Sequence, residues 1–321
     1  MSTTTHTAVC QFAQDVNEGL SAKNKYLSSR YFYDAKGDKI FQQIMKMPEY
    51  YLTDCEYEIF DLQKHEILEA IKPDCKFDLV ELGAGDGYKT KLLLEHFLKQ
   101  EVNFEYFPVD ISSDVLHELS ADLKNLFPNL NVRPLNNEYF SALDRLNEME
   151  DCPKVILFLG SNMGNFTPER AQIFFSKLQQ AMNPGDKLLI GVDLKKDPRT
   201  ILKAYNDEAG ITRSFNLNLL ERMNRELGAN FNLDNWDHYP TYDPFTGECR
   251  SYLMSTVNQE VHIEATGNTY KFNHSEPVHM EISRKYSLND LEELASNTGF
   301  KVQKHFLDSK EYFVDTLWEK C

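Results

Sequence analysis

Three glycines at alternate positions separate an apolar segment from a helical one, and they constrain the fold more than any other feature of the chain. Residues 79–82 end an apolar strand, and Gly83, Gly85 and Gly87 follow it closely. Glycine lets the backbone turn sharply and approach a ligand, and a helix beginning at about Tyr88 offers unpaired N–H groups there. The segment therefore predicts a strand, a nucleotide-binding turn and a helix.

The spacing of the glycines distinguishes between two kinds of cofactor-binding turn. A dinucleotide fingerprint has Gly-x-Gly-x-x-Gly, whereas here the third glycine comes one residue early and Glu81 precedes the first. That pattern is typical of enzymes that bind S-adenosylmethionine (SAM). The next expected strand, 104–109, leads to Asp110, whose carboxylate can accept hydrogen bonds from both ribose hydroxyls. The alternative is that Glu81 and Asp110 only cap or pair locally.

Composition and charge exclude several classes of protein. With 321 residues, 41% of them hydrophobic, the chain can bury a sizeable core. The formal net charge is −16, and the absence of a basic stripe argues against nucleic acid as a substrate. No segment approaches 18 apolar residues in a row and no signal-peptide pattern is present, so we expect a cytoplasmic protein that does not bind membranes. The oligomeric state stays open.

The cysteines and histidines predict no metal site. Six cysteines show no C-x-x-C spacing, and nine histidines include no H-E-x-x-H pair. We therefore expect reduced thiols and neither a zinc site nor a disulfide framework.

Strand-like runs alternate with amphipathic helical stretches between residues 77 and 194, as in a parallel sheet covered on both faces. The fold class expected is α/β, a doubly wound Rossmann-like sheet of the SAM methyltransferase type. Thr167 and Pro168 mark the beginning of one helix, as N-cap and first helical residue. Strands are expected at 77–82, 104–109, 132–135, 155–159 and 187–192, and helices at 89–100, 113–126 and 168–182.

The remaining residues predict a second, smaller lobe. A SAM-binding domain is expected to comprise residues 76–194 plus 286–321, and a substrate-binding lobe 1–75 plus 195–285. In that lobe one helical stretch, 201–227, precedes the segments of alternating character. Those segments are 250–257 and 260–265, and the C-terminal part adds a helix at 287–298 and strands at 301–306 and 312–317.

Asn165 follows the fourth expected strand, at the edge of the sheet that faces ligands in doubly wound folds. Its amide both donates and accepts, which suits a substrate with an amine beside a carboxylate. A turn asparagine that bonds to its own backbone is an equal alternative.

Tyrosines and one pair of polar strand residues are further candidates. The phenols of Tyr33, Tyr50 and Tyr205 can hold a carboxylate, and their faces can accept a methylated ammonium, although tyrosines also serve as packing residues. Glu281 and Ser283 lie two apart on an expected strand and so point the same way, toward a polar side chain. A solvated strand face, or cross-strand pairs with Lys or Arg, is the alternative for them.

Five short motifs carry a resemblance to a known family. With them the chain, from about residue 25 to its C-terminus, resembles the histidine-specific, SAM-dependent methyltransferase family of ergothioneine biosynthesis. That family trimethylates the α-amino group of histidine to give hercynine, and relatives act on other amines such as a prenylated tryptophan. The motifs are YFYDAKG at 31–37, PEYY at 48–51, ELGAG at 81–85, LGSNMGNF at 159–166 and AYND at 204–207.

The resemblance implies a position for each candidate residue. Beside the glycine turn with Gly85, it implies a SAM site formed by Tyr33, Gly83, Lys89 and Asp110. Around the amino and carboxylate groups of the substrate it implies Tyr50, Asn165 and Tyr205, and at the imidazole Glu281 and Ser283.

Two departures from the family pattern leave parts of the site open. Leu253, followed by Met254, stands where the histidine enzymes carry a methionine near the side-chain pocket. Residues 136–140, Asn-Asn-Glu-Tyr-Phe, replace the Gly-Asp-Phe that meets the adenine.

We therefore expect a SAM-dependent N-methyltransferase whose substrate is a free amino acid, histidine, and which adds up to three methyl groups to the α-amino nitrogen. An ammonium has no lone pair, so a proton must leave before each transfer, through Tyr205 or a water held by Asn165. The alternatives are an N-methyltransferase for another amine, such as a tryptophan derivative, and a non-catalytic SAM-binding protein.

Overall fold

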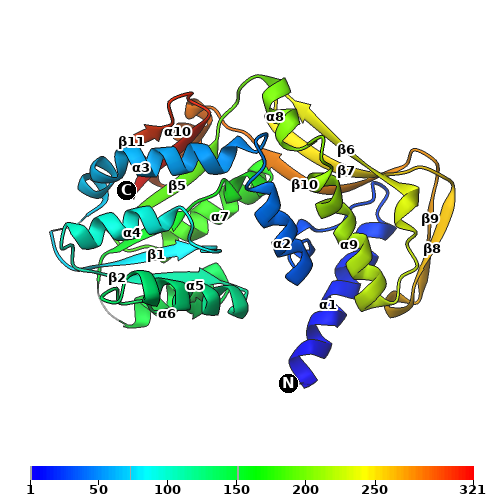
Figure 1. The fold of residues 1–321 in the computed structure, drawn as a ribbon, viewed down its shortest axis with the longest axis horizontal. Helices are drawn as coiled ribbons and strands as arrows, with labels where there is room; N and C mark the ends of the chain where they lie inside the picture. The colour runs from blue at the N-terminus through cyan, green and yellow to red at the C-terminus, as the bar shows by residue number, and fades with distance from the viewer. Residues whose placement is uncertain (1, 73, 150–151) are drawn as a thin grey trace. The chain divides into compact units, whose positions relative to one another are not determined.

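The glycine turn leads from a strand of a large sheet into a helix in the computed structural model, which describes residues 2–72, 74–149 and 152–321. The chain divides into two units (Figure 1). Unit 1 comprises Met1–Tyr51 and Lys196–Ser283, and unit 2 comprises Leu52–Lys195 and Arg284–Cys321. The expected division into a SAM-binding domain and a substrate-binding lobe concerns function and stays a prediction.

Unit 2 is built on a sheet with seven strands among the described residues, in the order β11-β12-β5-β4-β1-β2-β3. The five strands from β5 to β3 pair in parallel, and β12 pairs antiparallel with both β5 and β11. This topology confirms the expected doubly wound α/β sheet. The strands are β1 (Phe77–Leu82), β2 (Phe104–Asp110), β3 (Leu135–Asn136), β4 (Lys154–Phe158), β5 (Lys187–Asp193), β11 (Phe300–Leu307) and β12 (Phe313–Lys320).

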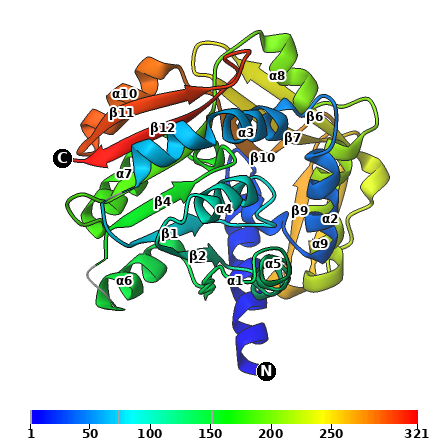
Figure 2. The same ribbon diagram turned by 60° about the vertical axis from the view of Figure 1, so that its left-hand side comes forward.

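Helices cover both faces of this sheet (Figure 2). Apolar side chains of α6 (Tyr139–Met149), α7 (Pro168–Ala181) and α10 (Leu288–Asn297) join one core cluster with the strands. On the opposite face, α3 (Tyr51–Ile71) packs against α4 (Thr90–Lys99) through His65 and His96, whose rings lie 5.9 Å apart. Helix α5 (Ser113–Leu126) follows β2. Among the helices of the described ranges, none has the length and apolar character that a membrane crossing requires.

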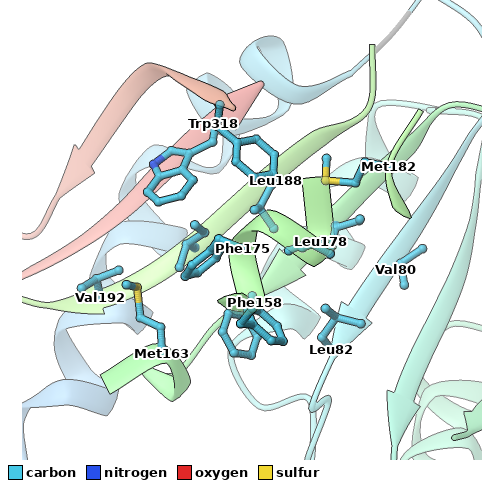
Figure 3. Packing of buried hydrophobic residues seen from close by; sticks show 14 of the residues in the cluster. Val80, Leu82, Phe158, Met163, Phe175, Leu178, Met182, Leu188, Val192 and Trp318 are labelled. Atoms are coloured by element: carbon cyan, nitrogen blue, oxygen red, sulfur yellow. The ribbon is translucent and has the colours of Figure 1, made fainter. Parts of the chain in front are cut away.

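Large aromatic side chains fill the core between α7 and the sheet (Figure 3). Phe175 of α7 lies 6.4 Å from Phe158 of β4 and 5.2 Å from Trp318 of β12, measured between ring centroids. Burial of each such side chain stabilises the fold by about 2–3 kcal/mol. The packing therefore joins the antiparallel end of the sheet to its parallel centre.

Unit 1 combines helices with two small antiparallel sheets. One sheet has the order β10-β7-β6 and the other pairs β8 with β9. Buried side chains from most of the helices and from both sheets form one core cluster, and Ile201, Ala204, Tyr205 and Cys249 form a smaller one. The elements are α1 (Ser2–Ser21), α2 (Ala35–Ile44), α8 (Pro198–Ala204), α9 (Ile211–Leu227), β6 (Trp236–Asp243), β7 (Glu248–Ser255), β8 (Gln259–Ile263), β9 (Asn268–Phe272) and β10 (Pro277–Arg284), with short 3₁₀ turns at Ser29–Tyr31, Leu233–Asn235 and Glu264–Thr266.

The expected single helical stretch at 201–227 is wrong, because the structure divides it into α8 and α9. Gly210 adopts a left-handed conformation, with φ 72°, directly before α9. The carboxylate of Asp207 accepts hydrogen bonds from the N–H groups of Ile211 and Thr212, at 2.7 and 2.8 Å. A side chain that satisfies the first N–H groups of a helix fixes where that helix begins.

Two further details of the sheet unit differ from expectation. The strand expected at 132–135 pairs only as Leu135–Asn136, apart from an isolated bridge between Val132 and Tyr106. Helix α6, which was not expected, follows it directly.

Candidate functional site

The glycine turn has the backbone geometry that the sequence requires. Gly83, Gly85 and Gly87 all have positive φ angles, of 76°, 55° and 62°. A Cβ atom built on Gly85 would meet no other heavy atom within 4 Å, whereas one on Gly87 would lie 2.8 Å from Leu119 Cδ1. Gly87 is therefore needed for packing against α5, and the backbone at Gly85 is open to close approach by a ligand.

Asp110 is fixed beside this turn at the end of β2. Its Oδ1 accepts a hydrogen bond from the N–H of Ser112 at 2.9 Å, and its Oδ2 lies 3.3 Å from the nitrogen of Gly85. A carboxylate offers about four lone-pair positions, so these contacts leave acceptor capacity for two hydroxyl groups. The partly exposed side chain can therefore accept hydrogen bonds from a ribose.

Lys89 stands directly before α4 and forms an ion pair with Glu56 of α3. The Glu56 carboxylate is fully buried, while the Lys89 side chain is 18% exposed and so accessible to a ligand. The other oxygen of Glu56 accepts a hydrogen bond from the N–H of Gly160 at 2.8 Å. Sequence reasoning missed Glu56, because no local spacing relates it to residues 33 and 104 positions further along the chain.

Glu81 is buried below the turn. It accepts hydrogen bonds from Thr90 Oγ1, at 2.6 Å, and from the hydroxyl of Tyr106. Burial raises the pKa of Glu81 to about 7, against the opposing effect of these two hydrogen bonds. The carboxyl group therefore connects β1 to β2 and to the beginning of α4. Local pairing of this kind was the alternative that the sequence allowed for Glu81.

The surroundings of Gly83 include two side chains that sequence reasoning did not assign. A Cβ built on this glycine would lie 3.0 Å from the hydroxyl of Tyr139 and 3.4 Å from Asn162 Nδ2. Burial, with smaller contributions from the charges of Asp110 and Glu138, raises the pKa of Tyr139 to about 12. Tyr139 belongs to the 136–140 segment that departs from the family pattern, so it brings that segment next to the glycine turn.

Asn165 ends a 3₁₀ turn, Asn162–Asn165, that follows two residues in left-handed conformation. The second of these is Ser161, with φ 58°, which is unusual for a residue other than glycine. Its Oγ accepts a hydrogen bond from the N–H of Asp193 at 3.1 Å, and its own N–H donates to Gly191 at 3.1 Å. Within the described ranges no hydrogen bond to the side-chain amide of Asn165 is found.

The three candidate tyrosines belong to one row of aromatic rings in unit 1. The rings of Tyr33 and Phe41 lie 5.6 Å apart, those of Phe41 and Tyr50 6.5 Å, and those of Tyr50 and Tyr205 6.4 Å. All three contacts are edge-on, the geometry that aromatic pairs favour. Residues that are far apart in the sequence are thus brought together in one contiguous set.

This row continues to a strand residue. The hydroxyl of Tyr205 lies 2.7 Å from Oγ of Ser283 in a buried position, and Glu281 is partly exposed two residues earlier on the same strand, β10. Leu253 of β7 is completely buried in the core cluster against which Tyr50 also packs. Tyr205, Ser283 and Tyr50 are therefore connected, and Leu253 lies in the same hydrophobic environment as Tyr50.

A model of one protein family matches residues 12–320, and its description is a SAM-dependent, histidine-specific methyltransferase. The chain belongs to this family. The resemblance expected from the five motifs is thereby confirmed, as are the enzyme class and the cofactor, SAM. The open backbone at Gly85, the fixed carboxylate of Asp110 and the accessible ammonium of Lys89 suit a nucleoside that carries an amino-acid tail.

The relatives of this chain are named for different amino-acid substrates. The chain is 34% identical to a histidine N-alpha-methyltransferase of Mycolicibacterium smegmatis, over 85% of this chain and 84% of the relative. It is 32% identical, with the same coverage, to a histidine N-alpha-methyltransferase of Mycobacterium tuberculosis. An L-tryptophan methyltransferase of Psilocybe serbica is 25% identical, over 90% of this chain and 87% of that relative.

Proposed function

We propose that this methyltransferase acts on the α-amino group of free histidine and adds three methyl groups, giving hercynine. The relatives named for histidine support this substrate, and the observation that carries it in the structure is the aromatic row that ends at the Tyr205–Ser283 hydrogen bond. A trimethylammonium retains its charge and makes no hydrogen bonds, so tyrosine faces suit it better than a rigid set of acceptors.

The residues of the cofactor site have separate tasks in this proposal. Asp110 accepts hydrogen bonds from the ribose, Gly83 and Gly85 allow the close approach of the nucleoside, Lys89 pairs with the carboxylate of the amino-acid tail, and Tyr33 adds an aromatic contact. SAM, when bound, supplies a methyl group on a positively charged sulfur, which leaves as a neutral thioether. The protein therefore contributes mainly alignment, for which effective molarities of about 10⁵ M or more are attainable.

The amine must lose a proton before it can accept a methyl group. Tyr205 is buried and shares a hydrogen bond with Ser283, so its hydroxyl has a defined direction. We assign to it the contact with the amine, and to Tyr50 and Asn165 the amino and carboxylate groups of the substrate. The proton leaves through Tyr205 or through a water held by Asn165, and these two routes stay open.

The side chain of histidine is distinguished by its ring nitrogens. Glu281 is assigned to accept a hydrogen bond from an imidazole N–H, and Ser283, two residues away, completes the polar end of the site. A site built to bond a polar group rejects an apolar side chain of similar size, because its own polar atoms would be left unpaired.

Purified protein with SAM and histidine, analysed by mass spectrometry over time, tests the proposal. Histidine gaining one, two and then three methyl groups supports it, and SAM binding without any methylated amino acid contradicts it.

A second candidate function is N-methylation of another amino-acid amine, such as tryptophan or one of its derivatives. The tryptophan-named relative and the leucine at position 253 favour it, since a buried leucine and a methionine shape a side-chain pocket differently. Including tryptophan in the same assay separates the two candidates. The cytoplasmic location expected from the sequence stays a prediction.

A further inference from the structure

Glu56 lies in α3, outside the motifs of the family pattern, and yet its carboxylate meets three segments of unit 2. It pairs with Lys89 at the beginning of α4, and Oε1 accepts a hydrogen bond from the N–H of Gly160 at 2.8 Å. Gly160 opens the turn that carries Asn165. One fully buried carboxylate thus connects the lysine beside the glycine turn to the backbone that leads to Asn165.

The third segment is the centre of β5, where Gly191 makes room for this carboxylate. A Cβ atom on Gly191 would lie 1.9 Å from Oε1 of Glu56 and 3.2 Å from Oδ1 of Asp315. Asp315 is the residue of the neighbouring strand, β12, that pairs with Gly191. The first distance is too short for any side chain. The space beside Gly191 is therefore occupied by the Glu56 carboxyl group, which has little freedom to move.

Two buried carboxyl groups and one ammonium meet at this point, and the ammonium of Lys89 forms its ion pair with Glu56. Neither oxygen of Asp315 has a hydrogen-bond partner among the described residues, and the side chain is completely buried. Burial, assisted by the charge of Glu56 and opposed by that of Lys89, raises the pKa of Asp315 well above its usual value. Asp315 therefore takes up a proton more readily than a solvated aspartate does, and Glu56 is the carboxyl group that forms the ion pair with Lys89.

We propose that Glu56 is a positioning residue of the SAM site, which acts by fixing the Lys89 ammonium against the turn at Gly160. The inference rests on the proposed role of Lys89 toward the carboxylate of the cofactor. An ammonium has three donors, and Glu56 engages one of them, while the side chain remains accessible at 18% exposure. The direction of the remaining donors is set by the position of Glu56.

Three variants and their combination test this inference through the SAM dissociation constant, measured by calorimetry without any amino acid. Glu56→Gln keeps the shape and an oxygen for Gly160, but its amide nitrogen turns a donor toward Lys89. Lys89→Met removes the ammonium. Asp315→Asn is the matched control, since it changes a buried carboxyl group of the same cluster into a neutral group of the same size.

We expect Glu56→Gln to weaken SAM binding at least tenfold and Asp315→Asn to change it less than twofold. In the Lys89→Met background, adding Glu56→Gln should change the affinity less than twofold, because the residue through which Glu56 acts is already gone. The double variant also removes both charges of the ion pair together, so the comparison with Lys89→Met still tests the inference if Glu56→Gln alone fails to fold.

The outcomes separate this inference from the proposed site. Unchanged or tighter SAM binding by Glu56→Gln, with Lys89→Met weakened, overturns the positioning role and leaves the site intact. A further tenfold loss in the Lys89→Met background also overturns it, since Glu56 would then act on SAM by another route. Unchanged SAM binding by Lys89→Met overturns the assignment of Lys89 itself, and with it the basis of the inference.

Discussion

The hydroxyl of Tyr205 and the Oγ atom of Ser283 lie 2.7 Å apart, and both side chains are buried. The resemblance implies that Ser283 meets the imidazole of the substrate, whereas the structure gives its hydroxyl a partner within the protein. Since a hydroxyl donates one hydrogen bond and accepts two, Ser283 can orient Tyr205 and still contact a ligand. The role proposed for Ser283 in orienting Tyr205 can therefore be tested separately from the role proposed for it in binding the imidazole.

Ser283→Ala should lower kcat for histidine by about fivefold, the effect of losing one hydrogen bond worth about 1 kcal/mol. Tyr205→Phe should lower kcat further, by about a hundredfold or more if the phenol moves the proton. In the Tyr205→Phe background, Ser283→Ala should have little further effect on kcat. Steady-state kinetics of the three variants measures this, and an unchanged kcat for Ser283→Ala, with only KM raised, would contradict the orienting role.

Glu281→Ala should raise KM for histidine by about tenfold to a hundredfold, because it removes a charged acceptor that contributes about 1.5–3 kcal/mol. KM for SAM should change little. Glu276→Ala removes a carboxylate that precedes β10 and pairs with Lys25, and serves as the control. Equal effects of Glu281→Ala on both substrates would remove the assignment of Glu281 to the imidazole.

Asp110→Ala should weaken SAM binding by about 1.5–3 kcal/mol, as expected for the loss of a charged acceptor. Asp114→Ala, an exposed carboxylate in the first turn of α5, is the matched control and should leave binding unchanged. Calorimetric titration with SAM gives both values. If the two variants bind SAM equally well, Asp110 does not hold the ribose.

Glu81 makes the stability of the protein depend on pH. Its pKa is raised from 4.5 to about 7 in the folded protein, so the folded state binds this proton more tightly than the unfolded chain does. Its stabilising contribution is complete below pH 4.5 and is lost as the pH rises through about 7. Glu81→Gln resembles the protonated form and should lose no such contribution.

The free energy of unfolding of Glu81→Gln relative to the unsubstituted protein should therefore increase by about 3 kcal/mol between pH 4.5 and 8. Urea titrations across this range measure the difference, in which the other titrating groups cancel. Glu95→Gln, an exposed residue of α4, is the control. A difference that stays constant with pH would show that Glu81 titrates normally.

The sheet of unit 2 could be predicted because its strands are largely apolar runs bounded by turn residues, as at β5. Prediction from the local sequence pattern failed where hydrogen bonds of individual side chains determine where a helix begins. Asp207 and Gly210 begin a new helix inside an otherwise helical stretch, and that depends on hydrogen bonds to α9. The contact between Glu56 and Lys89 spans 33 residues, so no short-range signal indicates it.

The candidate site likewise has a part that the local sequence predicts and a part that it does not. The glycine spacing and Asp110 follow from the strand and turn pattern, and the structure places them together. The tyrosines required the family resemblance, because nothing local distinguishes Tyr50 and Tyr205 from the other tyrosines of the chain, 16 in all. Their connection through Phe41 and Ser283 is a property of the folded chain alone.

The most direct test of the central claim is a competition assay in which equal concentrations of histidine and tryptophan share a limiting amount of SAM. Mass spectrometry identifies the products, and NMR locates the added methyl groups. We predict α-N-methylated histidine that proceeds to the trimethylated form, with little methylated tryptophan. Preferential methylation of tryptophan, or methyl groups on the imidazole of histidine, would contradict the claim.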